Sequence, residues 1–288
     1  MPPEEISAVT SDGVRLAIRR FAPAGAAGAG RGAVLCTHAM MVHGRYFHGR
    51  DGGFAAALAG HGLDVFVLDW RGHGDSKPPR PHDGTWTFDD YVTLDLPAAL
   101  AAVGTAAGCR AAEVAVLGHS LGGLVTLAAL GTGVVRVRRL VLAATSVWLP
   151  GAGGPWRRRA TMAVYDGVAR LLGHAPVKRL GFGSEDEPAS YVAQLAGWAR
   201  SGRWTSHEGA DYLAALAGID TPCWGVVGAG DSLCGPADTQ VLLRRIPGSA
   251  PLRVVGRAAG DALDPDHFTL FTRAELAPVW AEIARALS

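Results

Sequence analysis

Residues 113–130 read EVAVLGHSLGGLVTLAAL, and this stretch decides the fold. Its apolar start, 114–117, is typical of a buried strand, and its end, rich in leucine and alanine, is typical of a helix. Between the two, Gly118 and Gly122 flank Ser120 in a G-x-S-x-G pattern. Glycines at these positions let strand and helix pack closely around a sharp turn from which the serine hydroxyl projects. Ser120 is therefore our candidate for a catalytic nucleophile.

Length and composition favour one large domain, with or without an insertion. The chain has 288 residues, 49% of them apolar, and nearly balanced charges of 27 basic and 26 acidic residues. No basic field marks a nucleic-acid or anionic-membrane partner, and no apolar run is long enough for a membrane span. The first residues lack the apolar segment of a secretory signal, and the four cysteines are widely spaced. We therefore expect a cytoplasmic protein without disulfides.

Strand-like and helix-like stretches alternate on both sides of the serine turn. We expect a hairpin over 6–22, buried strands at 33–38, 63–70, 139–144, 223–227 and 252–255, and helices at 54–59, 87–103, 236–246 and 274–287. Thr87 and Asp90 are spaced like a capping box, and Pro97 predicts a kink or a restart within its helix. This order predicts an α/β fold with a mostly parallel central sheet and helices on both faces. Ligands bind such sheets at the carboxyl ends of the strands.

Residues 145–215 interrupt the alternation. They contain no convincing strand, four of the eight tryptophans and the basic cluster Arg157–Arg159. We interpret them as a helical cap inserted into a core formed by residues 1–144 and 216–288. The tryptophans either form the core of this insertion or line a substrate pocket, with Trp148 and Trp198 as candidates for substrate contact. The arginines form a solvated face or bind an anionic substrate group.

A serine nucleophile needs a base within hydrogen-bond reach, and the base needs an acid that orients it. In this architecture the acid and then the histidine follow the serine in the chain. Of the later histidines, only His267 lies outside the insertion, in a loop just before the last helix. Asp231 directly follows the strand-like stretch 223–227 and a Gly-Ala-Gly turn, which makes it the candidate acid. Its competitors on the loop of His267 are Asp261, Asp264 and Asp266.

An oxyanion requires two hydrogen-bond donors. One candidate is the backbone N–H of Leu121, which follows the nucleophile, and the other is that of Met40, with Ala39 as the alternative. His38, Met41 and His119 are candidate substrate contacts. His119 is expected to pack or form a hydrogen bond near the serine turn and not to act as the base. The other histidines match no compact ligand set, so we expect no metal. Asp69 and Arg71 are expected to form a supporting ion pair.

Five segments carry a resemblance to a known fold family: THAM (37–40), LDWRGHGDS (68–76), GHSLGG (118–123), GAGDSLC (228–234) and DHF (266–268). In this order they resemble an α/β-hydrolase-fold serine hydrolase. Within that fold the chain is similar to uncharacterised bacterial α/β hydrolases with a helical cap. It departs from many members at Ala39 and at Asp266, where they have glycine. A carboxylate at Asp266 that approached the imidazole would favour its protonated form.

The resemblance implies a hydrolase of the carboxylesterase or lipase type that acts on a small, apolar acyl substrate through an acyl-serine, without a cofactor. An acyltransferase, thioesterase, lactonase or perhydrolase would use the same three side chains. A non-catalytic, ligand-binding relative is the remaining alternative.

Overall fold

The centre of the molecule is a sheet of eight strands. The computed structural model describes residues 3–23, 32–148 and 155–288, and its sheet has the strand order β1-β2-β4-β3-β5-β6-β9-β10. The pairs β1–β2 and β2–β4 are antiparallel, and all the other neighbours are parallel. The α/β-hydrolase fold predicted from the sequence is therefore confirmed. The strands are β1 (Glu4–Val9), β2 (Arg15–Phe21), β3 (Ala33–Thr37), β4 (Asp64–Leu68), β5 (Ala115–His119), β6 (Leu140–Ala143), β9 (Cys223–Gly228) and β10 (Arg253–Val255).

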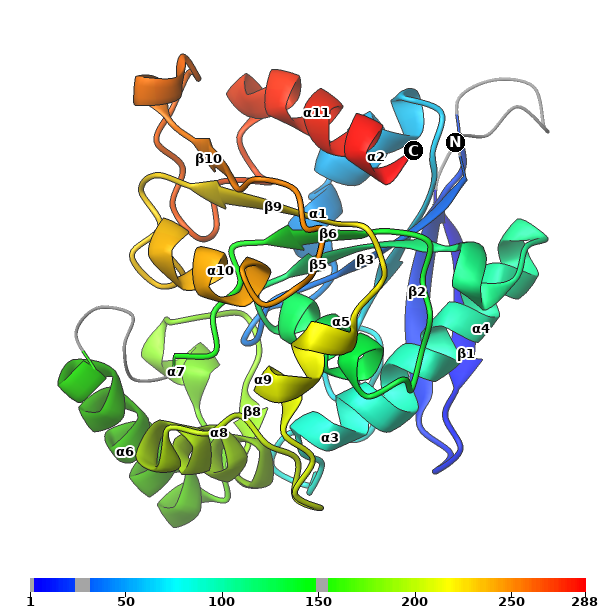
Figure 1. Cartoon of the computed structure of the whole chain (residues 1–288). Coiled ribbons are helices and arrows are strands. Elements are labelled where there is room, and N and C mark those ends of the chain that lie inside the picture. The colour runs from blue at the N-terminus through cyan, green and yellow to red at the C-terminus, as the bar shows by residue number, and fades with distance from the viewer. Residues whose placement is uncertain (1–2, 24–31, 149–154) are drawn as a thin grey trace.

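Helices cover both faces of this sheet, which explains why its central strands are apolar throughout. α2 (Gly53–Gly60) and α11 (Ala277–Leu287) lie on one face, and α4 (Leu96–Ala107), α5 (Leu121–Gly131) and α10 (Pro236–Leu243) lie on the other (Figure 1). Side chains alternate along each strand, so Val34 and Cys36 pack with the first group of helices and Leu35 with the second. Every residue of β3, β5 and β6 is buried.

The long helical stretch after residue 86 is interrupted, as its proline predicts. It begins with α3 (Phe88–Asp90), where the Thr87 backbone N–H donates to the Asp90 carboxylate at 2.6 Å. A π-helical turn over Tyr91–Asp95 follows, and α4 begins at Leu96, one residue before Pro97. Because proline has no N–H to donate, the regular hydrogen-bond ladder breaks at this point. The capping box predicted at Thr87 and Asp90 is confirmed.

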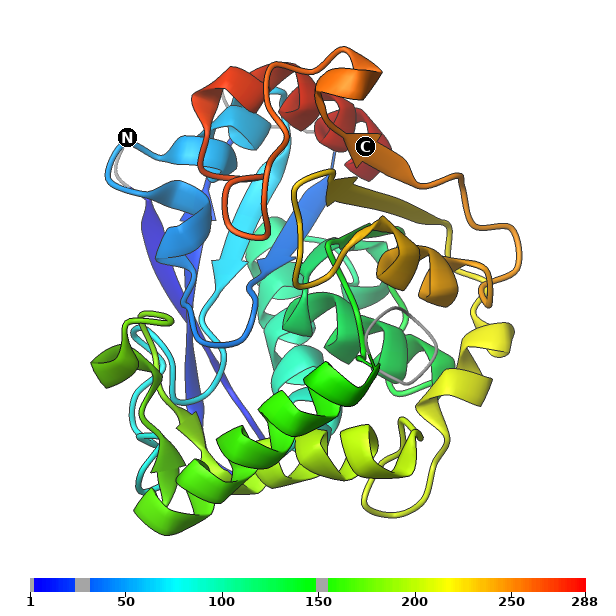
Figure 2. The same ribbon diagram turned by 90° about the vertical axis from the view of Figure 1, so that its left-hand side faces the viewer.

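Two helices of the predicted insertion pack against each other, away from the sheet. α6 (Pro155–Leu172) and α8 (Ala189–Ser201) lie side by side (Figure 2). Between them come β7 (His174–Ala175), α7 (Val177–Leu180) and β8 (Glu187–Pro188), and β7 pairs with β8 in an antiparallel sheet of its own. The expectation of no strand in 145–215 is therefore wrong for β7 and β8. Each of these strands has only two residues, which is too short to give a recognisable sequence pattern. Residues 149–154 of the predicted cap lie outside the described residues.

The remaining elements of the described residues are short. They are the helices α1 (Arg45–His48) and α9 (Tyr212–Ala215) and the 3₁₀ turns Ala111–Glu113, Leu216–Gly218, Arg257–Ala259 and Ala274–Leu276. Among the described residues, no helix is both long enough and apolar enough to cross a bilayer.

The expected ion pair between Asp69 and Arg71 is wrong. The buried Arg71 guanidinium instead contacts Asp95 at 2.7 Å and Asp12 at 2.8 Å. The Asp69 carboxylate accepts the backbone N–H groups of Gly44 at 2.5 Å and Asp75 at 2.9 Å. Asp69 therefore holds two loops at the carboxyl edge of the sheet, and Arg71 ties the loop after β4 to the helical stretch that follows and to the first hairpin.

Candidate active site

Ser120 occupies a strained turn between β5 and α5. Its φ is 53°, in the left-handed region that side chains rarely adopt. The turn closes only because its neighbours are glycines. A Cβ on Gly122 would lie 2.5 Å from the Thr37 carbonyl oxygen, and one on Gly118 would lie 2.6 Å from the Cα of Gly123. Strand β3 and helix α5 thus meet the turn without room for a methyl group, and the backbone places the Ser120 side chain at the carboxyl edge of the sheet.

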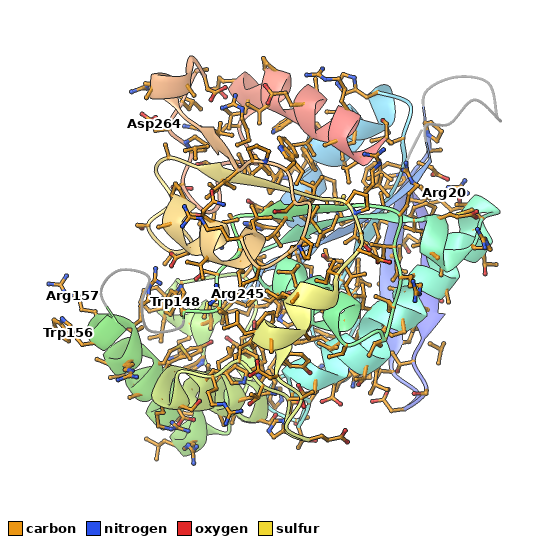
Figure 3. The ribbon with its side chains drawn as sticks, viewed as in Figure 1. Arg20, Trp148, Trp156, Arg157, Arg245 and Asp264 are labelled. Atoms are coloured by element: carbon orange, nitrogen blue, oxygen red, sulfur yellow. The ribbon has the colours of Figure 1, made fainter. Side chains whose placement is uncertain are left out.

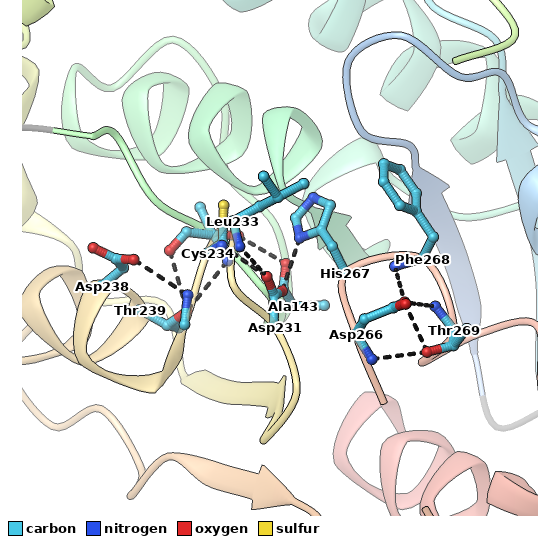
Figure 4. A network of polar contacts seen from close by, with 12 residues as sticks. Ala143, Asp231, Leu233, Cys234, Asp238, Thr239, Asp266, His267, Phe268 and Thr269 are labelled. Atoms are coloured by element: carbon cyan, nitrogen blue, oxygen red, sulfur yellow. Dashed lines mark hydrogen bonds and ion pairs between the residues drawn. The ribbon is translucent and has the colours of Figure 1, made fainter. Parts of the chain in front are cut away.

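The predicted base and acid are hydrogen-bonded to each other at the same edge. His267 Nδ1 lies 2.8 Å from Asp231 Oδ2, and both residues are buried (Figure 4). The other carboxylate oxygen, Oδ1, accepts the backbone N–H groups of Leu233 at 2.9 Å and Cys234 at 2.8 Å. These bonds fix the Asp231 carboxylate, so the His267 ring is oriented by a group that cannot turn away. The Cys234 thiol lies beside the Ser120 side chain, and burial raises its pKa.

Asp266, the unusual neighbour of His267, is turned away from the imidazole. Its Oδ1 accepts the backbone N–H groups of Phe268 at 3.0 Å and Thr269 at 2.9 Å, and the Thr269 hydroxyl at 2.8 Å (Figure 4). Partial burial opposes the charge, but these hydrogen bonds outweigh it and lower the pKa of Asp266. The carboxylate therefore caps its own turn. The other two alternatives to Asp231 as the acid also have other partners. Asp261 forms an ion pair with Arg253, and Asp264 accepts the backbone N–H of Arg257.

The two candidate oxyanion donors lie at the ends of neighbouring parallel strands. Leu121 is the first residue of α5, where a backbone N–H has no acceptor within the helix. Met40 lies in the turn after β3, and this turn is held through the next residue. The Met41 N–H donates to Glu187 Oε1 at 2.6 Å, and its carbonyl accepts the N–H groups of Ser184 at 2.8 Å and Glu185 at 3.0 Å.

A family comparison agrees with this geometry. The model of the family described as serine aminopeptidase, S33, matches residues 30–255. The chain belongs to this family. Its members share the α/β-hydrolase fold that the sheet order displays, and the matched range includes Ser120 and Asp231.

Two curated relatives align with part of the chain. Triacylglycerol lipase 2 of Arabidopsis thaliana is 33% identical over 139 residues, which cover 43% of this chain and 32% of the lipase. N-formylmaleamate deformylase of Pseudomonas putida is 36% identical over 107 residues, which cover 37% of this chain and 34% of the deformylase. The aligned part thus spans about a third of the length of each relative.

Solved structures match over nearly the whole S33-family chain. A hydrolase from Pseudomonas aeruginosa has a TM-score of 0.62 at 24% identity and covers 98% of both chains. An esterase from Exiguobacterium antarcticum has a TM-score of 0.66 at 16% identity, covering 98% of this chain and 100% of the esterase. An enol-lactonase from Burkholderia xenovorans has a TM-score of 0.63 at 20% identity, covering 98% and 99%. At these identities the likeness establishes the fold.

His119, a predicted substrate contact of this S33-family chain, is packed behind the base instead. Its ring stacks on Tyr46 with a centroid distance of 5.1 Å and lies 4.7 Å from the ring of His267. Burial, and then the neighbouring His267, hold the pKa of His119 well below its ordinary value. The Tyr46 hydroxyl donates to the His267 carbonyl at 3.3 Å. His119 is therefore a neutral support for His267.

Two other predicted substrate contacts, His38 and Trp198, are buried and make their hydrogen bonds within the protein. His38 is fully buried, with Nδ1 2.7 Å from the Ala39 carbonyl oxygen and Nε2 accepting the Trp70 N–H at 3.1 Å. Trp198 donates its indole N–H to the Thr205 carbonyl at 2.8 Å and packs on Phe88. Both nitrogens of His38 are used, and the Trp198 ring fills a core. We therefore correct both predictions to packing roles.

Trp148 lies at the edge of the site. Its φ is 54°, and its indole N–H donates to the carbonyl of Leu233 at 2.8 Å, on the loop that begins with Asp231. The guanidinium of Arg158 covers the Trp148 ring at 5.3 Å and pairs with Asp238 at 2.7 Å. Figure 3 shows Trp148 at the junction of the core and α6, whereas the exposed Trp156 and Arg157 point outward.

Sequence reasoning missed three residues around the site: Glu187, Tyr165 and Cys234. Glu187 is fully buried and contacts both Met41 and His73, whose Nε2 lies 3.2 Å from Glu187 Oε1. Tyr165 packs against two small apolar clusters, one shared with Met41 and the other with Trp148. Glu187 stands in the acidic stretch 185–187, which reads as a solvated face, so no signal in the sequence separates it from its neighbours.

Proposed function

We propose that the chain hydrolyses a carboxylic ester of a small acyl group through an acyl-serine at Ser120. The observation that carries this proposal is the buried hydrogen bond of 2.8 Å between His267 Nδ1 and Asp231 Oδ2, at the same sheet edge as the strained Ser120 turn. A fixed carboxylate and an oriented imidazole are what a serine hydroxyl needs to become a nucleophile.

In this mechanism His267 accepts the proton of Ser120 as the hydroxyl oxygen attacks the ester carbonyl. The negative charge that develops on the carbonyl oxygen is stabilised by the backbone N–H groups of Leu121 and Met40. The tetrahedral intermediate collapses, the proton on His267 moves to the leaving alcohol, and the acyl group stays on Ser120. A water molecule, deprotonated by His267, then releases the acid and restores Ser120. Asp231 keeps His267 in the tautomer and orientation that both halves require.

Residues 145–215 are proposed as the lid of this site. Support comes from three contacts that cross from this segment to the core: Glu187 with Met41, Trp148 with Leu233, and Arg158 with Asp238. The first contact is on the side of Met40 and the other two are on the side of Asp231. Met41 and Trp148, which adjoin the site and pack against apolar clusters of this segment, favour an apolar acyl group over a charged one.

Labelling with a fluorophosphonate probe tests the nucleophile. We expect stoichiometric labelling of the wild-type chain and none of Ser120→Ala, with the modified residue identified by mass spectrometry of the peptide. Labelling that persists in Ser120→Ala contradicts the assignment, and a wild-type chain that does not react indicates a ligand-binding protein. The Cys234 thiol lies beside Ser120, so Cys234→Ala is the matched control and should label normally.

Hydrolysis of p-nitrophenyl esters of graded chain length, with and without a competing alcohol, tests the reaction. We expect release of the free acid. Transfer of most of the acyl group to the alcohol would identify an acyltransferase instead.

A further inference from the structure

Among the side chains that the structure describes, three polar atoms of the proposed lid are inaccessible to solvent and make no hydrogen bond: Glu187 Oε2, the Tyr165 hydroxyl and Trp204 Nε1. Glu187 and Tyr165 lie close enough to interact electrostatically, so their two atoms are considered together. The other carboxylate oxygen, Glu187 Oε1, is engaged by the Met41 N–H and His73. A buried acceptor or donor without a partner costs free energy, so each such atom requires a physical explanation, and a hydrogen-bonding group that enters from outside the chain is one.

Both atoms belong to the neighbourhood of the proposed oxyanion donor. Glu187 contacts the backbone of Met41, the residue after Met40. Tyr165, on α6, packs against two small apolar clusters of the proposed lid, one of which also contacts Met41 and the other Trp148. Trp148 in turn bonds to Leu233, two residues after Asp231. Because Glu187 Oε1 accepts the N–H of Met41, the unpartnered atoms belong to the part of the proposed lid that adjoins the turn of Met40.

The chemistry of the two atoms is complementary. Burial, followed by the nearby Glu187, raises the pKa of Tyr165, so its hydroxyl remains a protonated donor. Glu187 offers only lone pairs on Oε2, and its charge has a counterpart in His73. Burial alone would lower the pKa of His73, but the contact with Glu187 outweighs it and raises that pKa. A neutral group that both donates and accepts a hydrogen bond fits this arrangement better than a cation.

We propose that Glu187 and Tyr165 form a subsite for a hydroxyl group on the acyl part of the substrate, which rests on ester hydrolysis at Ser120. The substrate hydroxyl donates to Glu187 Oε2 and accepts from the Tyr165 hydroxyl. This would restrict the substrate class to esters of short hydroxy acids.

The test compares ethyl esters of butanoic, 2-hydroxybutanoic, 3-hydroxybutanoic and 3-aminobutanoic acid by pH-stat. In the wild-type chain we expect kcat/KM for one of the two hydroxy esters to exceed that for butanoate by about tenfold, the size of one well-placed hydrogen bond. Tyr165→Phe should remove most of this ratio. Glu187→Gln, which keeps an oxygen for Met41 but presents an N–H in place of Oε2, should lower it as well. Tyr212→Phe removes a hydroxyl that donates to Asp89 outside the site, so it should keep the wild-type ratio.

The proposal is overturned if neither hydroxy ester is preferred, if the amino ester is the best substrate, or if Tyr165→Phe leaves the ratio unchanged. Fluorophosphonate labelling of Ser120 separates this failure from that of the proposed function. If the chain reacts with the probe and hydrolyses ethyl butanoate but shows no preference for a hydroxy ester, only the subsite is refuted. If it neither reacts with the probe nor hydrolyses any ester, both the subsite and the proposed function are refuted.

Discussion

Glu187 Oε1 accepts the backbone N–H of Met41 at 2.6 Å, across 146 positions of the chain. Met41 has a φ of 64°, and its carbonyl is held by the N–H groups of Ser184 and Glu185. Residues 184–187 thus hold the turn that contains Met40, because they hydrogen-bond to both the backbone N–H and the carbonyl of Met41. Because the N–H of Met40 is proposed to bind the oxyanion, we expect displacement of this part of the proposed lid to displace that donor.

Glu187→Ala removes this clamp. We expect kcat for ester hydrolysis to fall about tenfold to a hundredfold with a smaller change in KM, since a small displacement of a catalytic donor acts on the transition state. Glu187→Gln should recover most of kcat because its amide oxygen can accept the same N–H. Steady-state kinetics of Glu185→Ala provides the control, because this side chain contacts Gly74 and Lys77. Equal losses in both alanine variants would contradict a specific role for Glu187.

Removal of the reacting side chains should abolish turnover without unfolding the chain. We expect Ser120→Ala and His267→Ala each to lower kcat by about three orders of magnitude or more, and Asp231→Asn to cost somewhat less, as for other triads. The measurement is hydrolysis of p-nitrophenyl esters, with circular dichroism to verify the fold. An unchanged rate in His267→Ala would refute the proposed mechanism.

Gly122→Ala should destabilise the serine turn. The added methyl would meet the Thr37 carbonyl oxygen at 2.5 Å and the Thr37 hydroxyl at 2.3 Å, so we expect a loss of about 1–3 kcal/mol in the free energy of unfolding. Gly197→Ala is the matched control. A Cβ on Gly197, inside α8, meets no atom within 4 Å, and alanine should stabilise that helix by up to about 1 kcal/mol. Urea denaturation measures both, and equal effects would contradict the steric argument.

The buried pair of His73 and Glu187 should make stability depend on pH. Although burial opposes it, Glu187 raises the pKa of His73 in the folded chain above its ordinary value. The folded state therefore binds more protons than the unfolded state between the two pKa values. The contribution of the pair is complete below about pH 6.5, the ordinary pKa of histidine, and is lost as the pH rises through the raised pKa. Urea denaturation of the wild type and His73→Gln at several pH values should show a difference that shrinks with increasing pH; a difference that grows would contradict the pair.

The order of the proposed catalytic residues could be predicted from the sequence because the carboxyl ends of parallel strands meet at one edge of the sheet. Ser120 after β5, Asp231 after β9 and His267 after β10 each follow a recognisable strand, and the structure brings Asp231 and His267 into contact. The expectation that His119 packs near the serine turn agrees with the structure, where its ring lies against Tyr46 and His267, whereas its second role as a substrate contact does not. Because β5 ends at His119 and the chain turns sharply at Ser120, strand periodicity does not predict where the Ser120 side chain points relative to His119.

The chain by itself determined the fold class, the serine turn and the approximate positions of the helices, because these depend on local periodicity, glycines and caps. The helix ends differ by a few residues, since α4 ends at Ala107 and α10 at Leu243. Only the tertiary structure decided which distant polar groups meet: Arg71 with Asp95 rather than Asp69, and Glu187 with Met41. Such pairs form where the insertion and the loops fold back on the sheet, and no local pattern encodes their partners. The physical reason is that a buried charge must find a counterpart in three dimensions, and only the completed packing determines which one lies within reach.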